Sequence, residues 1–151
     1  MQFREAIIVW SLPANNNIAK FILGWKGIVW ELSRLWAPDD HERNLLTQAI
    51  SRSLKRLVKI ENPDAVISYA DPSVGHSGGV YRAASWIAYG QSEENRTYRS
   101  ADGKIIARRA FHSGRKFLLK HEIEQMGYVQ LNLPGKYRFV RLLSKRARQV
   151  K

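Results

Sequence analysis

A glycine-rich loop that follows a short apolar run is the segment of the sequence best suited to chemistry. The run is Ala65-Val66-Ile67-Ser68-Tyr69, and the loop extends from Pro72 to Gly79, before a stretch of helical character at 80–86. A helix N-terminus presents unpaired backbone N–H groups, and glycine lets the backbone approach an anion closely. Gly75, Gly78 and Gly79 can therefore hold a pyrophosphate. The spacing matches neither a Walker loop nor a G-x-G-x-x-G fingerprint, so a plain strand-to-helix turn is the alternative.

Polar side chains in and beside this loop are the candidates for catalysis. Asp71 can act as a base or orient a substrate amine, or it can cap the N–H groups of its own loop. Ser68 and Tyr69 alternate faces of a strand, so one can donate a hydrogen bond to an acyl carbonyl or a leaving thiolate while the other is structural. His76 can contact a phosphate, shuttle protons or bond locally. The other three histidines lack the spacing of metal ligands, so we predict no zinc site.

The formal net charge of +12 is built from the C-terminal third of the chain. Acids and bases are nearly balanced over residues 1–95. Residues 96–120 carry eight Lys and Arg against one Asp, and residues 136–151 carry seven with no acid. A folded domain this basic usually meets phosphates, and no segment is a basic amphipathic helix with a wide apolar face. Nucleic acid is therefore the expected partner, and a membrane is not.

Basic and aromatic residues alternate after Pro134-Gly135, a pattern that suits phosphate pairing and base stacking but also fits a strand with one solvated face. Arg34 stands among apolar neighbours, where an arginine often has a phosphate or carboxylate partner, or occupies a solvated edge. Tyr81 and Arg82 lie in the first helical turn, and each can contact a ligand. Otherwise Tyr81 is a core residue and Arg82 is a solvated one. The candidate DNA-contacting residues are Arg34, Arg82, Arg108, Arg109, Arg115, Lys116, Lys136, Tyr137 and Arg138.

The surrounding pattern predicts the elements that must position these residues. Asp39, with Glu42 three residues later, predicts the start of a helix that continues as an apolar stripe to Asn62-Pro63. The run at 65–69 directly after that helix predicts a central strand. Residues 91–104 are polar and predict a loop or an irregular hairpin. The remaining expected elements are strands at 3–10, 19–25, 27–36, 87–89, 128–133 and 137–143 and helices at 80–86 and 117–126.

Length and composition bound the class of protein. The 151 residues fit one domain that buries its own core, and the absence of cysteine excludes disulfides and thiolate metal sites. No apolar run reaches the roughly 20 residues that span a bilayer, and the N-terminus lacks a signal-peptide pattern. We expect a cytoplasmic protein without a membrane partner.

Three stretches together resemble the Mom family of phage DNA-modification proteins. The specific one joins Val66-Ile67-Ser68-Tyr69-Ala70-Asp71-Pro72 to Gly75-His76-Ser77-Gly78-Gly79-Val80-Tyr81-Arg82-Ala83-Ala84. Weaker matches are Glu31-Leu32-Ser33-Arg34-Leu35-Trp36 and Leu133-Pro134-Gly135-Lys136-Tyr137-Arg138-Phe139-Val140. The resemblance covers residues 28–143.

The resemblance implies an α+β fold of the GNAT-like acyltransferase superfamily. Such a fold has a mixed, mostly antiparallel central sheet with helices on both faces, here in a single domain at 1–143 followed by a basic tail at 144–151. In that superfamily the central strand splays from its neighbour, the pantetheine of acyl-CoA lies in the splay, and the pyrophosphate rests on the glycine loop. With acetyl-CoA as the expected donor, the cofactor-binding residues are Ile67, Gly75, His76, Ser77, Gly78, Gly79, Val80 and Tyr81.

The resemblance further implies an enzyme that modifies the exocyclic N6 amine of adenine in phage DNA with a carbamoylmethyl-type group and so blocks restriction. The target base must then leave the stack to reach a buried cofactor. A carbamoylmethyl product does not follow simply from attack on acetyl-CoA, so the transferred group and any metal step stay open. The alternatives are an N-acyltransferase acting on a protein or small-molecule amine, and a non-catalytic DNA-binding module. A homodimer would let two basic faces grip one duplex.

Overall fold

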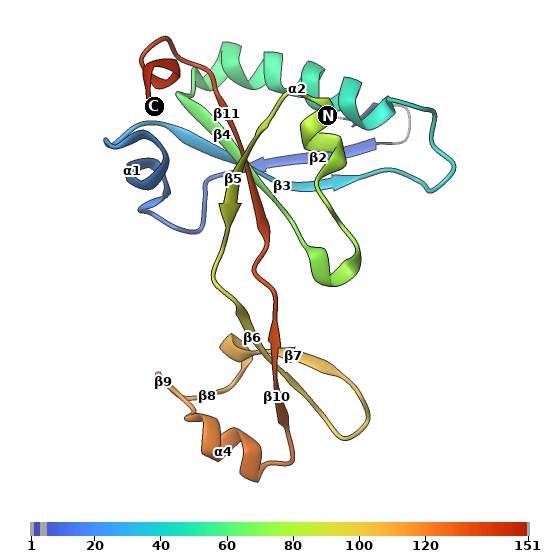
Figure 1. Cartoon of the computed structure of the whole chain (residues 1–151), viewed down its shortest axis with the longest axis vertical. Helices are drawn as coiled ribbons and strands as arrows, with labels where there is room; N and C mark the ends of the chain where they lie inside the picture. Colours follow the sequence, from blue (N-terminus) through green and yellow to red (C-terminus); the bar gives the residue numbers. More distant parts are fainter. Residues whose placement is uncertain (1, 4–5, 151) are drawn as a thin grey trace.

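β4 (Ala65–Ala70) lies inside a six-stranded sheet, as its apolar sequence predicts. The computed structural model describes residues 2–3 and 6–150 (Figure 1). The order across the sheet is β1 (Gln2–Phe3), β2 (Ala6–Ser11), β3 (Val29–Trp36), β4, β11 (Tyr137–Leu142) and β5 (Ile87–Gln91). Neighbouring strands are antiparallel except for β3 and β4, which are parallel. The mixed, mostly antiparallel sheet predicted from the sequence is confirmed.

β3 and β4 separate partway along their length. Their backbone pairing covers Val29–Glu31 on β3 and Ala65–Ile67 on β4, although β3 continues to Trp36. Beyond that point β3 remains paired with β2, and β4 remains paired with β11. Each strand is therefore held on its outer side while the two part from one another directly after Glu31.

Two apolar clusters pack against this sheet, and successive strand residues belong to different clusters because their side chains alternate between faces. Val66 lies in a cluster with residues of α2 (Leu45–Glu61) and α3 (Gly79–Ala83). Its neighbours Ala65 and Ile67 lie in the other cluster, with residues of α1 (Ile18–Leu23). Ala147, within a 3-10 turn at Ala147–Gln149, is fully buried in that second cluster, so part of the basic tail packs on the sheet.

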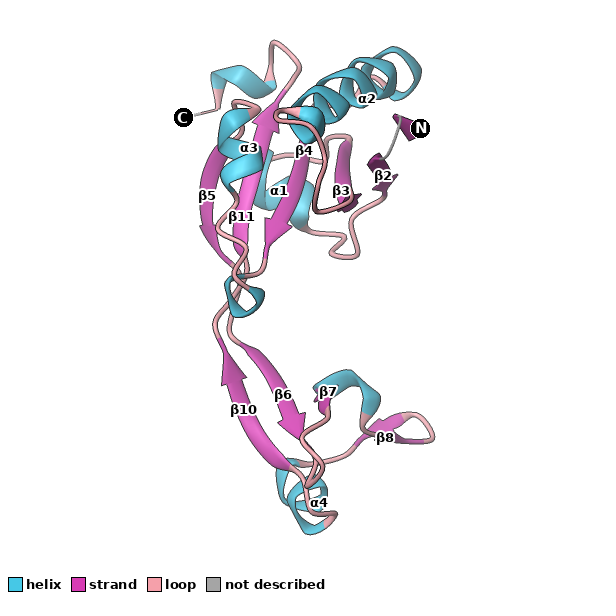
Figure 2. Cartoon of the chain, turned by 90° about the vertical axis from the view of Figure 1, so that its right-hand side faces the viewer, coloured by secondary structure: helices cyan, strands magenta, loops and turns pink. Residues whose placement is uncertain are grey.

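Residues 95–133 form a separate body, which we call the small body; the rest of the described chain is the main body (Figure 2). Tyr98, Phe111 and Ile123 are the buried core of the small body, and the Phe111 ring lies edge-on to Tyr98. Its elements are a sheet of order β10 (Val129–Leu133), β6 (Asn95–Arg99) and β7 (Ile105–Ala107), a 3-10 turn at Arg108–Ala110, a hairpin of β8 (His112–Ser113) and β9 (Lys116–Phe117), and α4 (Lys120–Gln125).

Two chain segments connect the bodies, and they are tied to one another where they leave the main body. Ser92 N donates to Lys136 O at 2.9 Å, and Lys136 N donates to Ser92 Oγ at 2.9 Å. A Cβ on Gly135 would lie 1.8 Å from Ser92 O, so this close approach requires glycine. The small body is thus an insertion in the chain between β5 and β11.

Two sequence-based predictions of secondary structure are wrong, and a third holds in one of its two forms. Residues 19–25 form α1 rather than a strand, because Ile18, Ile22 and Leu23 share one buried helical face. The long helix begins at Leu45 and not near Asp39, since the preceding residues form turns in which His41 bonds to Pro38 O. For residues 91–104, where the sequence allows a loop or an irregular hairpin, the structure has the hairpin. β6 pairs with β7 and with β10, and this pairing buries Thr97 and Tyr98. No helix among residues 2–3 and 6–150 is both long and apolar enough to cross a bilayer.

Candidate functional site

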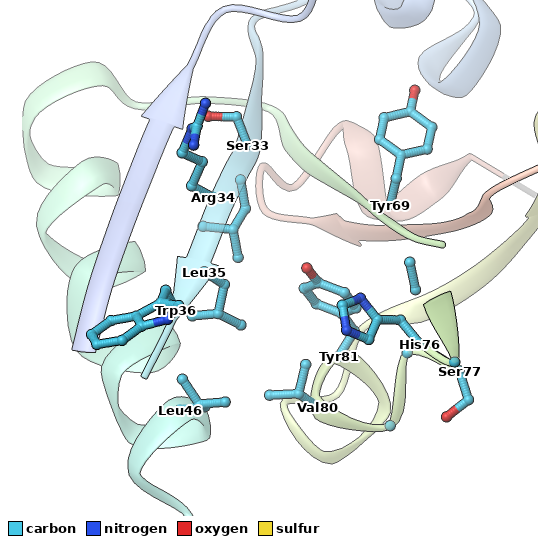
Figure 3. A pocket seen from close by; sticks show the side chains of 15 residues that line it. Ser33, Arg34, Leu35, Trp36, Leu46, Tyr69, His76, Ser77, Val80 and Tyr81 are labelled. Carbon is cyan, nitrogen blue, oxygen red and sulfur yellow. The ribbon is translucent and has the colours of Figure 1, made fainter. Parts of the chain in front are cut away.

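The parting of β3 and β4 opens a cleft of about 650 Å³. The end of β3 forms one side and the glycine loop with α3 forms the other, and Leu46 of α2 and Val80 approach each other at one end (Figure 3). Leu32, Ser33, Arg34, Leu35 and Trp36 line the β3 side. All seven predicted residues of the loop line the facing side: Gly75, His76, Ser77, Gly78, Gly79, Val80 and Tyr81.

A short series of hydrogen bonds joins the two sides beneath the cleft. The buried Ser68 hydroxyl donates to Leu32 O at 2.8 Å, just beyond the last backbone pair of β3 and β4. The Tyr81 hydroxyl lies 2.8 Å from Ser68 Oγ. Because a serine hydroxyl has a single proton, Tyr81 is the donor in that pair. Burial raises the pKa of Tyr81, so its phenol stays protonated at neutral pH.

Glu31 is a half-buried carboxylate at the point where β3 and β4 part, and the sequence-based site prediction missed it. Burial raises the pKa of Glu31, against an opposing effect of the positive charge on Lys136. Its own charge adds to burial in raising the pKa of Tyr69 and of Tyr81. Glu31 therefore lies within electrostatic reach of both tyrosines. The signal in the sequence was a lone acid in the strand run Val29–Trp36.

Asp71 caps the 3-10 turn at Pro72–Val74. Its carboxylate accepts hydrogen bonds from the Ser73 N–H, at 2.9 Å, and from the Ser73 hydroxyl, and it lies 3.9 Å from Lys136 Nζ. The Ser73 hydroxyl is the main reason that the pKa of Asp71 is lowered. Asp71 does not line the cleft. The structure therefore places it in the capping arrangement, and its catalytic role stays a prediction.

The glycine loop is supported by Phe139 and Arg82, while several of its backbone amides have no partner within the described chain. Gly78 has a φ of +79°, and a Cβ there would lie 2.1 Å from the Phe139 ring. Arg82 Nη1 donates to Ser77 O at 2.8 Å while its guanidinium lies over the same ring, so Arg82 supports the loop. The N–H groups of residues 77–80 donate to no other residue that the structure describes. Four consecutive free amides beside a cleft suit an anionic ligand.

The other two predicted residues of β4 differ in position. Ile67 is fully buried in the cluster with α1, so its side chain does not line the cleft. The strand alternation that turns Ser68 toward Tyr81 turns Ile67 away. Tyr69 lines the cleft, half-buried, with its hydroxyl directed away from Tyr81 in Figure 3. Burial raises the pKa of Tyr69, while Arg138, its partner in the register of β4 and β11, acts to lower it.

The predicted DNA-contacting residues fall into groups that the sequence did not separate. Three arginines donate to main-chain carbonyls inside the protein: Arg82, Arg108 and Arg138. Arg34 lines the cleft. Three line a second cavity, between the bodies: Arg109, Lys136 and also Arg108. The remaining three are exposed to solvent: Arg115, Lys116 and Tyr137.

The sheet and cleft define a mixed α/β protein in which two parallel strands part beside a glycine loop. The chain belongs to the Mom protein family, whose model matches residues 4–151. It is 34% identical over 155 residues to a protein of Escherichia phage Mu named methylcarbamoylase Mom. The alignment covers 95% of this chain and 61% of that relative, so the chain spans about three-fifths of the relative's length. The family resemblance inferred from the motif at 66–84 is confirmed.

Proposed function

We propose that this protein is a DNA-modifying transferase that places a methylcarbamoyl-type group on the exocyclic N6 amine of adenine and so protects DNA from restriction. Membership of the Mom family and the likeness to a methylcarbamoylase support the type of reaction. The observation that carries the proposal is the cleft between β3 and β4. It sets a loop with free amides beside a buried pair of hydrogen-bonded hydroxyls.

The residues around the cleft fit an acyl-CoA donor, with acetyl-CoA as the simplest. The free amides of residues 77–80 suit a pyrophosphate. Beyond Glu31, the β3 edge that faces β4 has no strand partner, so it can pair with the amides of a pantetheine arm as it would with an added strand. When bound, the carrier would supply an activated two-carbon group. The amide nitrogen of a methylcarbamoyl product is not present in acetyl-CoA, so it has to come from a further nitrogen donor. A glycine loop beside parting parallel strands also supports our assignment of a GNAT-like fold.

The chain's own residues provide a proton acceptor and a rigid frame. The exocyclic amine of adenine is a weak nucleophile, so a base must take its proton. Glu31 does not itself line the cleft, but it directly precedes Leu32, which does. We assign it this role because it is half-buried where β3 and β4 part and its pKa is raised. We assign positioning roles to Ser68, which holds Tyr81, and to Asp71, which shapes the loop. Of the three predicted catalytic residues, Tyr69 is the one that lines the cleft and can contact substrate.

The basic C-terminal part of the chain supports DNA as the substrate. Residues 96–151 carry fifteen Lys and Arg against three acids, a net charge of +12, whereas residues 1–95 carry ten of each sign. Such a concentration of positive charge attracts a phosphate backbone and makes binding depend steeply on salt. The cleft is recessed, so an adenine in a duplex has to be flipped out of the stack to reach it.

Mass spectrometry of nucleosides tests the proposal. Plasmid DNA from cells that express the full chain is digested and compared with DNA from cells that express the Glu31→Gln variant. We expect a modified deoxyadenosine with the unaltered protein and far less with the variant. An unmodified nucleoside profile in the presence of folded protein would contradict the DNA reaction. Acyl transfer from acetyl-CoA to a small amine or a protein, unaffected by DNA, would favour the alternative N-acyltransferase.

A further inference from the structure

A second cavity, of about 540 Å³, lies where the two bodies meet. Ala107, Arg108, Arg109 and Phe117 line it from the small body, and Lys136 lines it from the start of β11. Its volume is in the range of ligand-sized cavities. Lys136 also approaches the turn that follows β4, because its Nζ lies 3.9 Å from the carboxylate of Asp71, which caps that turn.

Phe117 is the unusual member of this lining. Its side chain is 56% exposed, and it takes no part in the core formed by Tyr98, Phe111 and Ile123. The guanidinium of Arg108 lies over its ring, 5.6 Å from the centroid. Arg108 is itself fixed, because it donates to Phe111 O at 3.4 Å and to Leu118 O. A large aromatic ring is thus held in a defined orientation and left open to solvent.

Positive charge surrounds this ring. Arg109 and Lys136 are both exposed and line the same cavity. An aromatic face with cations on its flanks matches one class of ligand closely, because nucleic-acid bases stack on aromatic side chains while their phosphates pair with Lys and Arg. An acidic peptide would satisfy the cations without using the ring.

We propose that this cavity binds one unstacked nucleotide of the DNA strand that carries the target adenine, with the base on Phe117 and the phosphates at Arg109 and Lys136. The inference rests on the proposed DNA substrate and assigns a function to the small body, which contributes nothing to the lining of the cleft. Since Lys136 also pairs with the glycine-loop carboxylate, a strand held in the cavity lies beside the loop that borders the cleft. The small body then acts as a clamp on the flanking strand.

Fluorescence measurements on the full chain test this inference. Single-stranded DNA carrying 2-aminopurine is titrated with the unaltered protein, with Phe117→Ala and with Ile105→Ala. Ile105 is a matched control, because it is a 51% exposed apolar residue of the small body outside the cavity. We expect Phe117→Ala to bind about tenfold more weakly and to lose the quenching that stacking causes, while Ile105→Ala binds normally. Phe117→Trp should keep both properties.

Substitution of a cationic residue of the cavity gives a second measurement. We expect Arg109→Ala to reduce the slope of log affinity against log salt by about one, because one phosphate contact is lost. If Phe117→Ala binds and quenches like the unaltered protein, the stacking site is refuted and the DNA reaction still stands. If both apolar variants weaken binding equally, the effect belongs to the small body as a whole and the stacking site is again refuted. If the unaltered protein binds no DNA, this inference and the proposed function fail together.

Discussion

The hydroxyl groups of Ser68 and Tyr81 lie 2.8 Å apart and join β4 to α3 beneath the cleft. Backbone pairing between β3 and β4 ends one residue before Ser68, and the Ser68 hydroxyl spans the parting strands by donating to Leu32 O. The cleft therefore has a floor of side-chain hydrogen bonds where a regular sheet would have backbone bonds. Both hydroxyls are buried, and the Tyr81 hydroxyl depends on Ser68 for its partner.

Ser68→Ala should destabilise the protein by about 1–3 kcal/mol, because it leaves the buried Tyr81 hydroxyl and Leu32 O without partners. Urea unfolding followed by circular dichroism measures the change. Ser33→Ala is the matched control, since the Ser33 hydroxyl bonds to Val9 O on an exposed part of β3 and its loss should cost well below 1 kcal/mol. Equal effects of the two substitutions would show that the buried pair adds nothing.

Gly78→Ala should be far more destabilising than Gly75→Ala, although both glycines have a φ near +80°. At Gly75 a Cβ meets open space, so only the left-handed backbone is penalised, by about 1–2 kcal/mol. At Gly78 a Cβ would lie 2.1 Å from the Phe139 ring, and displacing that ring adds about 1–3 kcal/mol. Thermal unfolding of the two variants gives the comparison. Similar melting temperatures would mean that the loop does not rest on Phe139 in solution.

Glu31→Gln should abolish most DNA modification and yet raise stability at neutral pH. The folded protein raises the pKa of Glu31 above its ordinary value, chiefly by burial. Such a group favours folding while it is protonated, and this advantage is lost as pH rises through the folded pKa. The ionised carboxylate is thus a cost at pH 7 that glutamine removes, whereas loss of a base lowers the rate about 10²–10⁴-fold.

Two measurements check that prediction. The stability gain of Glu31→Gln, from denaturant unfolding, should shrink as pH is lowered toward and below 4.5, the ordinary pKa of Glu. The rate of the unaltered enzyme should rise with pH through the raised pKa. A variant that is less stable at pH 7, or one that retains full activity, would remove Glu31 from the proposed role.

Asp71→Asn should keep most activity and Asp71→Ala should lose more, because an amide oxygen can still accept the Ser73 N–H. The pKa of Asp71 is lowered, mainly by the Ser73 hydroxyl. Its carboxylate therefore favours folding above its ordinary pKa, and this contribution is lost as pH falls through the folded pKa. Nucleoside analysis and acid unfolding of both variants test this assignment. A complete loss of activity in a folded Asp71→Asn protein would instead support Asp71 as a base.

The part of the site that could be predicted from the sequence is the part that lies close together along the chain. A strand, a glycine loop and a helix within residues 65–86 line one side of the cleft because their connections are short. Glu31 escaped prediction because its importance depends on where β3 stops pairing with β4, which is a relation between residues 36 positions apart. Sequence pattern alone does not specify that register.

The amount of positive charge could be predicted from the sequence, but the partners of the individual arginines could not. The excess of Lys and Arg after residue 95 is visible in the composition, yet Arg108 and Arg138 donate to carbonyls of their own chain. An arginine side chain is long enough to reach many acceptors, so its neighbours in space decide its role. Residues 19–25 were mistaken for a strand for a related reason. Their β-type composition was overridden by packing of Ile18 and Ile22 against the sheet.

The tie between Ser92 and Lys136 places the two ends of a 43-residue excursion next to each other in space. Because these ends already lie together and the entropy of closing a loop grows only slowly with its length, a long insertion there need not disturb the strands that border the cleft. A short turn grafted between β5 and β11 should therefore leave the sheet of the main body and its cleft intact. In this architecture the residues that line the cleft and those that make up the small body belong to separate parts of the chain.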